Sequence, residues 1–303
     1  MLNLIANLLA LSLSVWSPPV NIVYSSGPLR GTEACLESGH LPLNDDVPAR
    51  KMPAPSIAAK SAAVLTDDGH VWLAAKAPER RQAIASITKL MTALVFLDNN
   101  PGWEKEYTIR RDDIVEGGKI NLFLGETVKV KDLFNASLVA SDNGATLALV
   151  HATGLSTADF MVAMNNKAKD LGLLQTEFAD PVGLSNGNLS NVRDVARLAQ
   201  AALNKAEIEA AVARHTYRFQ TVQGREKLLE STDWLLDSSS SSTLKALGGK
   251  TGYTDQAGYC FVGRFQDKDG RSVIVAVLDT GGKNERFLQA RALATWAFTY
   301  CQW

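Results

Sequence analysis

A serine and a lysine stand three residues apart at the start of an apolar stretch, in the sequence Ser86-Ile87-Thr88-Lys89. The apolar residues recur at the spacing of one buried helix face, at Ile87, Leu90, Met91, Leu94 and Val95. In a helix that begins here, Ser86 lies near the positive end of the helix dipole, and Lys89 lies one turn along on the same face. A serine hydroxyl is a weak nucleophile and needs a base, which Lys89 can be only when it is neutral. The spacing therefore predicts a serine nucleophile with a lysine base.

Two further polar motifs follow, Ser141-Asp142-Asn143 after an apolar run and Lys250-Thr251-Gly252 just before a segment with strand character. In Ser141-Asp142-Asn143, the second motif, the outer two side chains can point into one cleft while the middle one turns away. They offer a hydroxyl that relays a proton and an amide that holds a substrate amide. In Lys250-Thr251-Gly252, the third motif, a cation, a hydroxyl and a residue without Cβ suit an extended peptide that ends in a carboxylate. Lys250 is also the cation expected to lower the pKa of Lys89.

Each motif alone has an ordinary structural explanation. Ser86 alone predicts a helix N-cap, the second motif a polar loop between helices, and the third a turn. The spacing itself is not specific, because Ser242-Thr243-Leu244-Lys245 repeats it. That copy ends a run of serines and precedes Gly248-Gly249, so it is predicted to be a solvated loop. The occurrence of all three motifs in this order favours a catalytic site.

The chain resembles the low-molecular-mass penicillin-binding proteins, which are the serine D-alanyl-D-alanine carboxypeptidases and endopeptidases of bacterial cell walls. Active-site-serine β-lactamases share the same set of motifs. The resemblance runs from about Ser61 to Tyr300, and the stretch from Gly249 to Val262 is similar to the endopeptidase branch. The matching segments are Ala85 to Ala93, Ser141-Asp142-Asn143, Met164-Asn165, Gly183-Leu184, Gly249 to Thr254 and Ala257-Gly258.

The resemblance implies a serine peptidase that cleaves peptidoglycan stem peptides through an acyl-enzyme. Ser86 is expected to attack the carbonyl of a D-alanine while Lys89 accepts its proton. Ser141 is expected to pass a proton to the leaving amine. The backbone amides of Ser86 and Tyr253 are expected to form the oxyanion hole.

The resemblance also implies the substrate contacts. Asn143 is expected to orient the acyl side of the substrate, and Lys250, Thr251 and Gly252 are expected to hold its terminal carboxylate. The expected partners are stem peptides and, as covalent inhibitors, β-lactam antibiotics. No cofactor and no metal are expected.

Three other functions remain open at this point. A serine β-lactamase of the common class would carry a deacylating glutamate between the second and third motifs, where residues 176–183 instead resemble the peptidases. A non-catalytic peptidoglycan-binding protein would keep the cleft without turnover. An α/β-hydrolase could use Gly183-Leu184-Ser185-Asn186-Gly187 as a nucleophile elbow. However, Pro181 is unfavourable in the strand that must precede the elbow, and His215 is the only histidine that follows Ser185.

The sequence departs from the family pattern at two positions near the motifs. Ile84 stands where a proline is common, and Asp233 stands where an asparagine is common. Neither side chain is expected to touch the chemistry.

The composition describes an ordinary globular protein. The 303 residues include 31 basic and 32 acidic ones, and 46% are hydrophobic, so no nucleic-acid partner is expected from the charge. The three cysteines are too scattered for a disulfide framework or a zinc site, and Cys260 is predicted to be a small core residue. The histidines show no metal or triad spacing, and they are His40, His70, His151 and His215.

The N-terminal segment predicts export. Residues 1–17 are expected to be a signal peptide or an N-terminal anchor, because Leu4 to Val15 is an apolar run that resembles a secretory h-region. Seven of the ten prolines lie between Pro18 and Pro55, so residues 18–57 are predicted to be a linker. Residues 58–303 form the predicted catalytic domain, and the predicted location is the periplasm. Membrane contact is expected at most through the N-terminal segment.

The predicted fold is α/β of the α+β kind, similar to β-lactamases and transpeptidases. A hairpin of residues 62–66 and 71–74 and a second of residues 258–265 and 272–278 should join in one antiparallel sheet, with a helical block between them. Helices are predicted to begin after Ser156 and after Ser190. A closing helix is predicted at residues 286–298. The chain leaves room for this helix only, so the β-rich second domain of anchored relatives is not expected.

Overall fold

The computed structural model describes residues 54–115, 117–118, 120–236 and 243–303. The predicted signal or anchor segment, nearly all of the predicted linker and the second Ser-x-x-Lys serine, Ser242, lie outside the described residues. The proposed domain boundaries therefore stay predictions. Cys35 and His40 also lie outside this part of the chain.

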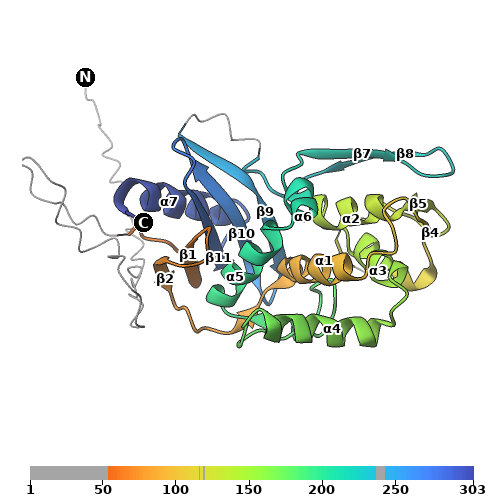
Figure 1. Ribbon diagram of the computed structural model, residues 1–303, viewed down its shortest axis with the longest axis horizontal. Helices are drawn as coiled ribbons and strands as arrows, with labels where there is room; N and C mark the ends of the chain where they lie inside the picture. Colours follow the sequence, from red (N-terminus) through yellow and green to blue (C-terminus); the bar gives the residue numbers. More distant parts are fainter. Residues whose placement is uncertain (1–53, 116, 119, 237–242) are drawn as a thin grey trace, which may run out of the picture.

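One five-stranded antiparallel sheet is built from both ends of the described chain (Figure 1). Its strands lie in the order β2-β1-β11-β10-β9. They are β1 (Ser61–Thr66), β2 (Trp72–Lys76), β9 (Leu244–Thr254), β10 (Gly258–Asp267) and β11 (Ser272–Thr280). The N-terminal hairpin joins the C-terminal strands where β1 pairs with β11, with Val64 opposite Val275. Both predicted hairpins and their union in one sheet are confirmed.

The sheet is buried on both faces, which explains why its central strands are almost continuously apolar. Along β11, Val273, Val275 and Val277 face the core beneath helix α7 (Glu285–Tyr300). The alternate residues Ile274, Ala276 and Leu278 face the core shared with the helical block. Side chains of successive strand residues point to opposite faces, so a strand covered on both sides needs apolar residues at every position.

Six helices form the block on the other side of the sheet (Figure 1). They are α1 (Thr88–Asp98), α2 (Val130–Val139), α3 (Asn143–Ala152), α4 (Thr157–Asp170), α5 (Val192–Leu203) and α6 (Ala206–Val212). The predicted starts are confirmed, because Ser156 accepts a hydrogen bond from Asp159 N at 3.1 Å and Asn191 caps α5 in the same way. Helix α1 is buried on nearly all sides and therefore lies at the centre of this helical block.

Three short two-stranded antiparallel sheets complete the fold of the described residues. Strand β4 (Glu106–Thr108) pairs with β5 (Thr127–Lys129), and β7 (Thr216–Gln220) pairs with β8 (Glu226–Glu230). Strand β3 (Gln82–Ala83) pairs with β6 (Leu189–Ser190) just before α1. No single helix among the described residues is long and apolar enough to cross a membrane, although α3 and α4 together pass that test as a pair bent by 95°.

Two predictions about the C-terminal part need correction. Lys250-Thr251-Gly252 does not precede a strand but lies inside the edge strand β9, because the glycines before it permit close pairing with β10 instead of forming a turn. A Cβ at Gly249 would collide with the carbonyl oxygen of Val262. Cys301 is disulfide-bonded, whereas Cys260 is a buried free thiol, as predicted.

Candidate active site

Ser86 lies in a short 3-10 helix, η1 (Ala85–Ile87), between β3 and α1. Its neighbour Ala85 has a φ of 48°, in the left-handed region that residues with a Cβ rarely adopt. Such backbone strain is concentrated at functional sites, where the surrounding structure holds it in place. Ser86 is therefore not the N-cap of a regular helix but the middle residue of a tight, strained turn.

Two glycines let neighbouring segments approach this turn. A Cβ at Gly183 would collide with the carbonyl of Ala85, and Gly183 itself has a φ of 89°. A Cβ at Gly252 would lie 2.7 Å from the carbonyl oxygen of Ile84 and 3.3 Å from the backbone nitrogen of Ser86. The edge strand β9 therefore passes directly beside the nucleophile, and it does so because residue 252 has no side chain.

Lys89 is fully buried with its amine directed at Ser86. The Nζ atom lies 3.0 Å from Ser86 Oγ, 2.7 Å from Asn143 Oδ1 and 2.6 Å from the carbonyl oxygen of Val182. A neutral amine has two N–H donors and one lone pair. The two carbonyl-type acceptors take the two donors, which leaves the lone pair for the hydroxyl hydrogen of Ser86. This geometry suits Lys89 as a base.

The surroundings of Lys89 favour the neutral amine at near-neutral pH. Burial lowers its pKa from 10.5 to about 7, although the carboxylates of Asp142 and Asp180 act in the opposite direction. Those two carboxylates are themselves engaged elsewhere by hydrogen bonds. Burial therefore lowers this pKa, in place of the neighbouring cation that the sequence predicted.

Ser141-Asp142-Asn143 turns as its sequence predicts. Ser141 has a φ of 58°, and Asp142 faces away to cap α3 by accepting a hydrogen bond from Ala145 N at 2.8 Å. Asp142 also accepts from the side chain of Asn121 at 2.7 Å. Asn143 faces the cleft, where it accepts from Lys89 and donates to the carbonyl oxygen of Gly117 at 3.0 Å. Its amide is held at both ends and thereby oriented.

Lys250 is the second fully buried lysine, and its partner is Ser141. Its Nζ donates to Ser141 Oγ at 2.7 Å and to the carbonyl oxygen of Thr251 at 3.2 Å. Burial lowers the pKa of Lys250 well below its usual value, and the charges of Lys89 and Arg286 lower it further. The charge of Lys89 thus disfavours the charged form of Lys250, whereas burial, and not the predicted effect of Lys250, accounts for the lowered pKa of Lys89. A bound carboxylate would favour the charged form of Lys250.

Thr251 is hydrogen-bonded to a residue in a segment that contains none of the three motifs. Its hydroxyl donates to the hydroxyl of Thr232 at 2.7 Å. Thr232 lies in the turn after β8, where its backbone nitrogen donates to the carbonyl oxygen of Val139 at 3.1 Å. This turn thus connects the third motif to the end of α2, which leads into the second motif.

Asp233 affects the electrostatics of the site, which corrects the expectation that its side chain plays no part in the chemistry. Its carboxyl is only 3% exposed, and its Oδ2 atom has no hydrogen-bond partner among the described residues. Burial raises the pKa of Asp233 to about 6, while the nearby charges of Arg286 and Lys250 lower it. Arg286 is buried as well and donates to the carbonyl oxygen of Gly252 at 3.2 Å. An acid at this position therefore acts on the cations around the third motif.

The loop at residues 176–183, between the second and third motifs, leaves neither of its two carboxylates free for deacylation. Asp180 accepts from the backbone nitrogens of Val182 at 2.7 Å and Gly183 at 2.6 Å, and from the side chain of Asn188 at 2.9 Å. Glu177 points outward and pairs with Arg81 at 2.7 Å. Asp180 instead shapes the turn that brings the carbonyl of Val182 to Lys89. This role was missed, and its only signal was the Asp-Pro-Val-Gly sequence.

The α/β-hydrolase alternative is wrong. Residues 181–188 form an irregular turn, with neither a strand before Ser185 nor a helix directly after it. The hydroxyl of Ser185 accepts from Gly187 N at 3.1 Å, which is a local turn contact. The elbow geometry that would expose and activate Ser185 is absent from this described segment.

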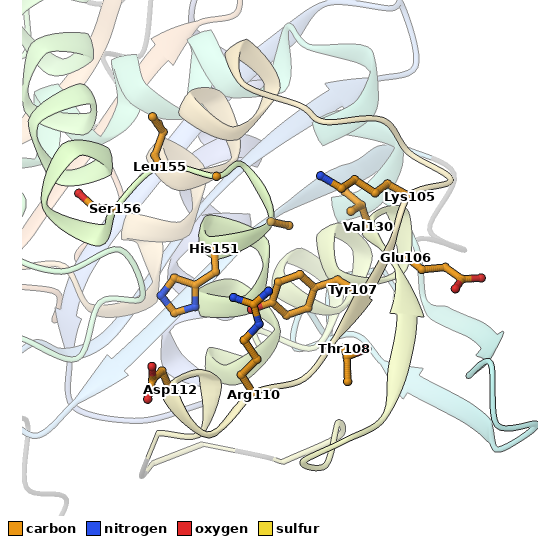
Figure 2. Close-up of a pocket in the computed structure, with 12 residues that line it drawn as sticks. Lys105, Glu106, Tyr107, Thr108, Arg110, Asp112, Val130, His151, Leu155 and Ser156 are labelled. Atoms are coloured by element: carbon orange, nitrogen blue, oxygen red, sulfur yellow. The ribbon is translucent and has the colours of Figure 1, made fainter.

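A hollow of about 750 Å³ lies elsewhere, between β4 and the end of α3 (Figure 2). His151 binds the buried Asp113 at 2.6 Å, Tyr107 donates to the same carboxylate at 3.0 Å, and Arg110 lies over the Tyr107 ring at 5.1 Å. The hollow contains none of the residues of the three motifs. Its charged groups are paired or open to solvent, so its volume does not make it the catalytic site.

The sequence profile of peptidase family S11, described as D-alanyl-D-alanine carboxypeptidase, matches residues 48–282. The chain belongs to this family. It is 34% identical over 232 residues to a D-alanyl-D-alanine endopeptidase of Haemophilus influenzae, covering 75% of this chain and 78% of that one. It is 31% identical to the D-alanyl-D-alanine endopeptidase of Escherichia coli, covering 81% of this chain and 79% of that one.

The fold is similar to that of solved members of the family. The crystal structure of the Streptomyces K15 DD-transpeptidase matches with a TM-score of 0.75 at 27% identity, covering 82% of this chain and all (100%) of that one. The predicted family, fold and enzyme class are thereby confirmed, and the protein is a serine peptidase of the penicillin-binding type. Peptidoglycan substrates and β-lactam binding follow for the family in general.

Proposed function

We propose that this protein is a DD-endopeptidase that cleaves cross-linked stem peptides and also removes terminal D-alanine, both through an acyl-enzyme on Ser86. The observation that carries the proposal is the pair of buried lysines, each 3.0 Å or less from one serine hydroxyl. One lysine has its lone pair directed at the nucleophile. The other lysine, Lys250, is placed to supply a proton to Ser141 and to bind a substrate carboxylate.

Acylation begins when Ser86 Oγ attacks the carbonyl carbon of the D-alanine on the acyl side. Lys89 Nζ, at 3.0 Å, takes the hydroxyl proton as the new carbon–oxygen bond forms. The backbone amides of Ser86 and Tyr253 receive the negative charge that develops on the carbonyl oxygen. Each such donor typically lowers the barrier by about 3 kcal/mol.

The carbon–nitrogen bond breaks when the leaving amine receives a proton from Ser141. Lys250 lies 2.7 Å from Ser141 Oγ and replaces that proton. The substrate carboxylate, held by Lys250 and Thr251, favours the protonated form of this lysine and so prepares the donor. Asn143 orients the acyl side. Water then attacks the ester carbonyl and gives a proton back to Lys250 through Ser141, and Lys89 returns its proton to Ser86 Oγ as the ester bond breaks.

The endopeptidase preference is supported by the relatives, because several matches at about one third identity are named D-alanyl-D-alanine endopeptidases. The carboxypeptidase reaction shares the same acyl-enzyme and is the second activity. A β-lactamase is disfavoured because both carboxylates of the loop at residues 177–180 are engaged by other groups.

We also propose export to the periplasm. The N-terminal apolar run resembles a secretory signal, and the substrate class lies outside the cytoplasm. The disulfide at Cys301 fits an oxidising compartment.

The test is to incubate the purified protein with intact peptidoglycan and, separately, with cross-linked dimers and monomeric pentapeptides, and to identify the products by mass. Conversion of dimers to monomers together with conversion of pentapeptides to tetrapeptides supports the proposal. Intact dimers beside trimmed pentapeptides would reduce it to a carboxypeptidase. A Ser86→Ala protein is the matched control for contaminating hydrolases.

A further inference from the structure

Four aromatic rings form a surface next to the third motif, which we call the aromatic shelf. They are Trp234, Tyr253, Tyr259 and Phe287. Trp234 and Tyr253 are 44% and 48% exposed, although large aromatic residues usually bury their rings. Two large rings left open next to the third motif indicate a binding surface.

Each exposed ring rests on a more buried one. Trp234 stacks on Phe287 with centroids 6.0 Å apart, and Tyr253 stacks on Tyr259 at 4.2 Å. The guanidinium of Arg286 connects the two pairs, because it lies 5.6 Å from the Tyr259 centroid and 4.7 Å from the Phe287 centroid. The shelf is thus rigid before any ligand arrives, which lowers the entropy cost of binding.

Positive charge lies beside the exposed rings. Lys283 Nζ is 4.5 Å from the Trp234 centroid, and the buried Arg286 has an Nε atom without a hydrogen-bond partner among the described residues. Acidic groups also lie nearby: the buried Asp233, Asp255, which accepts from the Tyr253 hydroxyl at 2.8 Å, and Glu285, which begins α7 two residues after Lys283. An elongated ligand with apolar stretches and carboxylates matches this arrangement of rings and cations.

The shelf adjoins the residue that holds the substrate carboxylate in the proposed reaction. Thr232, two residues before Trp234, bonds to Thr251 at 2.7 Å, and Tyr253 follows Thr251 by two positions on β9. The shelf therefore lies on the leaving-group side. In carboxypeptidase action the leaving group is D-alanine, whose side chain is only a methyl group. In endopeptidase action the side chain of the leaving residue continues into a second stem peptide, which carries further carboxylates.

We propose that the aromatic shelf binds the leaving stem peptide of a cross-link, and that Trp234 is the residue that favours cross-linked over monomeric substrate. This inference rests on the proposed function and names the part of its substrate that the three motifs do not touch. The ring interactions of Trp234 among the described residues are with Phe287 and Lys283, and not with Ser86 or the motif lysines, so its removal should leave acylation intact.

The experiment compares the wild type with Trp234→Ala on purified cross-linked dimers and monomeric pentapeptides. The expected kcat/KM of Trp234→Ala falls about tenfold on dimers and less than about twofold on pentapeptides, consistent with one lost stacking contact. Trp234→Phe should restore most of the dimer activity. Tyr300→Ala removes an aromatic ring that is also 42% exposed, at the far end of α7, and should change neither substrate.

The acylation rate with penicillin measures folding and chemistry independently of the leaving peptide. Unchanged acylation with selective loss on dimers supports the shelf. Equal loss on both substrates, or no loss on dimers, would overturn it. Wild-type protein that trims pentapeptides but leaves dimers intact would also overturn it while the DD-peptidase activity stands, whereas a wild type inactive on both would overturn the proposed function itself.

Discussion

The catalytic cleft and the hollow beside His151 lie at opposite ends of the same helix. Asn143 begins α3 at the cleft, and His151 lies in its last turn at the hollow, about 12 Å away along the axis. The cleft contains two buried lysines whose hydrogen-bond partners are hydroxyl, amide and carbonyl oxygens. The hollow instead pairs His151 with a buried carboxylate, and its Lys105 and Arg110 are accessible to solvent (Figure 2).

This difference shows what makes a site reactive. An exposed lysine or arginine keeps its proton near neutral pH, because water stabilises the charge. A buried lysine that meets only uncharged oxygens loses that stabilisation, and its amine becomes a usable base. Burial without a direct carboxylate partner, rather than the size of the opening, distinguishes the cleft from the hollow.

The largest expected effect is a substitution that keeps the charge but removes the base. Lys89→Arg should lower the rate of acylation by penicillin about 10³-fold, because arginine remains protonated and cannot accept the Ser86 proton. Lys250→Arg should retain partial activity, since arginine keeps the positive charge that meets the substrate carboxylate but cannot replace the proton of Ser141. Stopped-flow or gel measurement of labelling rates decides this. Equal rates in the two variants would mean that the roles of the lysines are assigned wrongly.

A smaller effect is expected from filling the space between β9 and the nucleophile. Gly252→Ala should lower the acylation rate about 100-fold, because its Cβ would lie 2.7 Å from the carbonyl oxygen of Ile84 and must push β9 away from Ser86. Gly281→Ala is the matched control, since the nearest atom to its Cβ would be 3.7 Å away. Both proteins should keep their circular dichroism spectra. Wild-type acylation by Gly252→Ala would show that this close approach is not needed.

The pH dependence should be a property of the cleft alone. Burial lowers the pKa of Lys89 to about 7, and the base is the deprotonated amine that predominates above this value. The acylation rate should therefore rise about tenfold per pH unit below the pKa and level off above it. Arg110→Ala, in the hollow, should give the same profile. A rate that stays constant between about pH 5.5 and 7.5 would contradict a lysine base.

The smallest catalytic effect is expected at the hollow. His151→Ala should change the acylation rate less than about twofold but should lower the free energy of unfolding by about 1–3 kcal/mol, because buried Asp113 loses a hydrogen-bond partner. Denaturant unfolding measures the second quantity. Thr157→Ala is the control, since its hydroxyl lies 3.3 Å from the other ring nitrogen in an exposed position. A large loss of acylation in His151→Ala would mean that the two ends of α3 are coupled.

The features that the sequence predicted well are those encoded locally. The hairpin β1–β2, the helix after Ser156 and the helix after Ser190 all follow from apolar spacing and capping residues within one segment. The three motifs also indicated the cleft, because each contains its own chemistry in consecutive residues. The outer side chains of Ser141-Asp142-Asn143 do share one cleft while the middle one caps a helix.

The features that escaped prediction depend on segments that meet only in the folded chain. Ser141 and Lys250 are 109 positions apart, and their hydrogen bond forms only because β9 packs against the turn between α2 and α3. Thr232 and the carbonyl of Val182 likewise come from segments without a motif. Gly249 indicates a turn when the sequence is considered alone, but in the sheet it permits close contact with Val262. Asp233 affects the site through burial, which no local pattern reveals.

The most direct test of the central claim is to find the atom that penicillin acylates. The wild-type protein should gain one penicilloyl mass, and digestion should place it on the peptide that contains Ser86. Ser86→Ala should gain no mass, while Ser185→Ala should label like the wild type, because only Ser86 has a buried lysine amine at 3.0 Å. A penicilloyl group on another serine, or undiminished labelling of Ser86→Ala, would contradict the account.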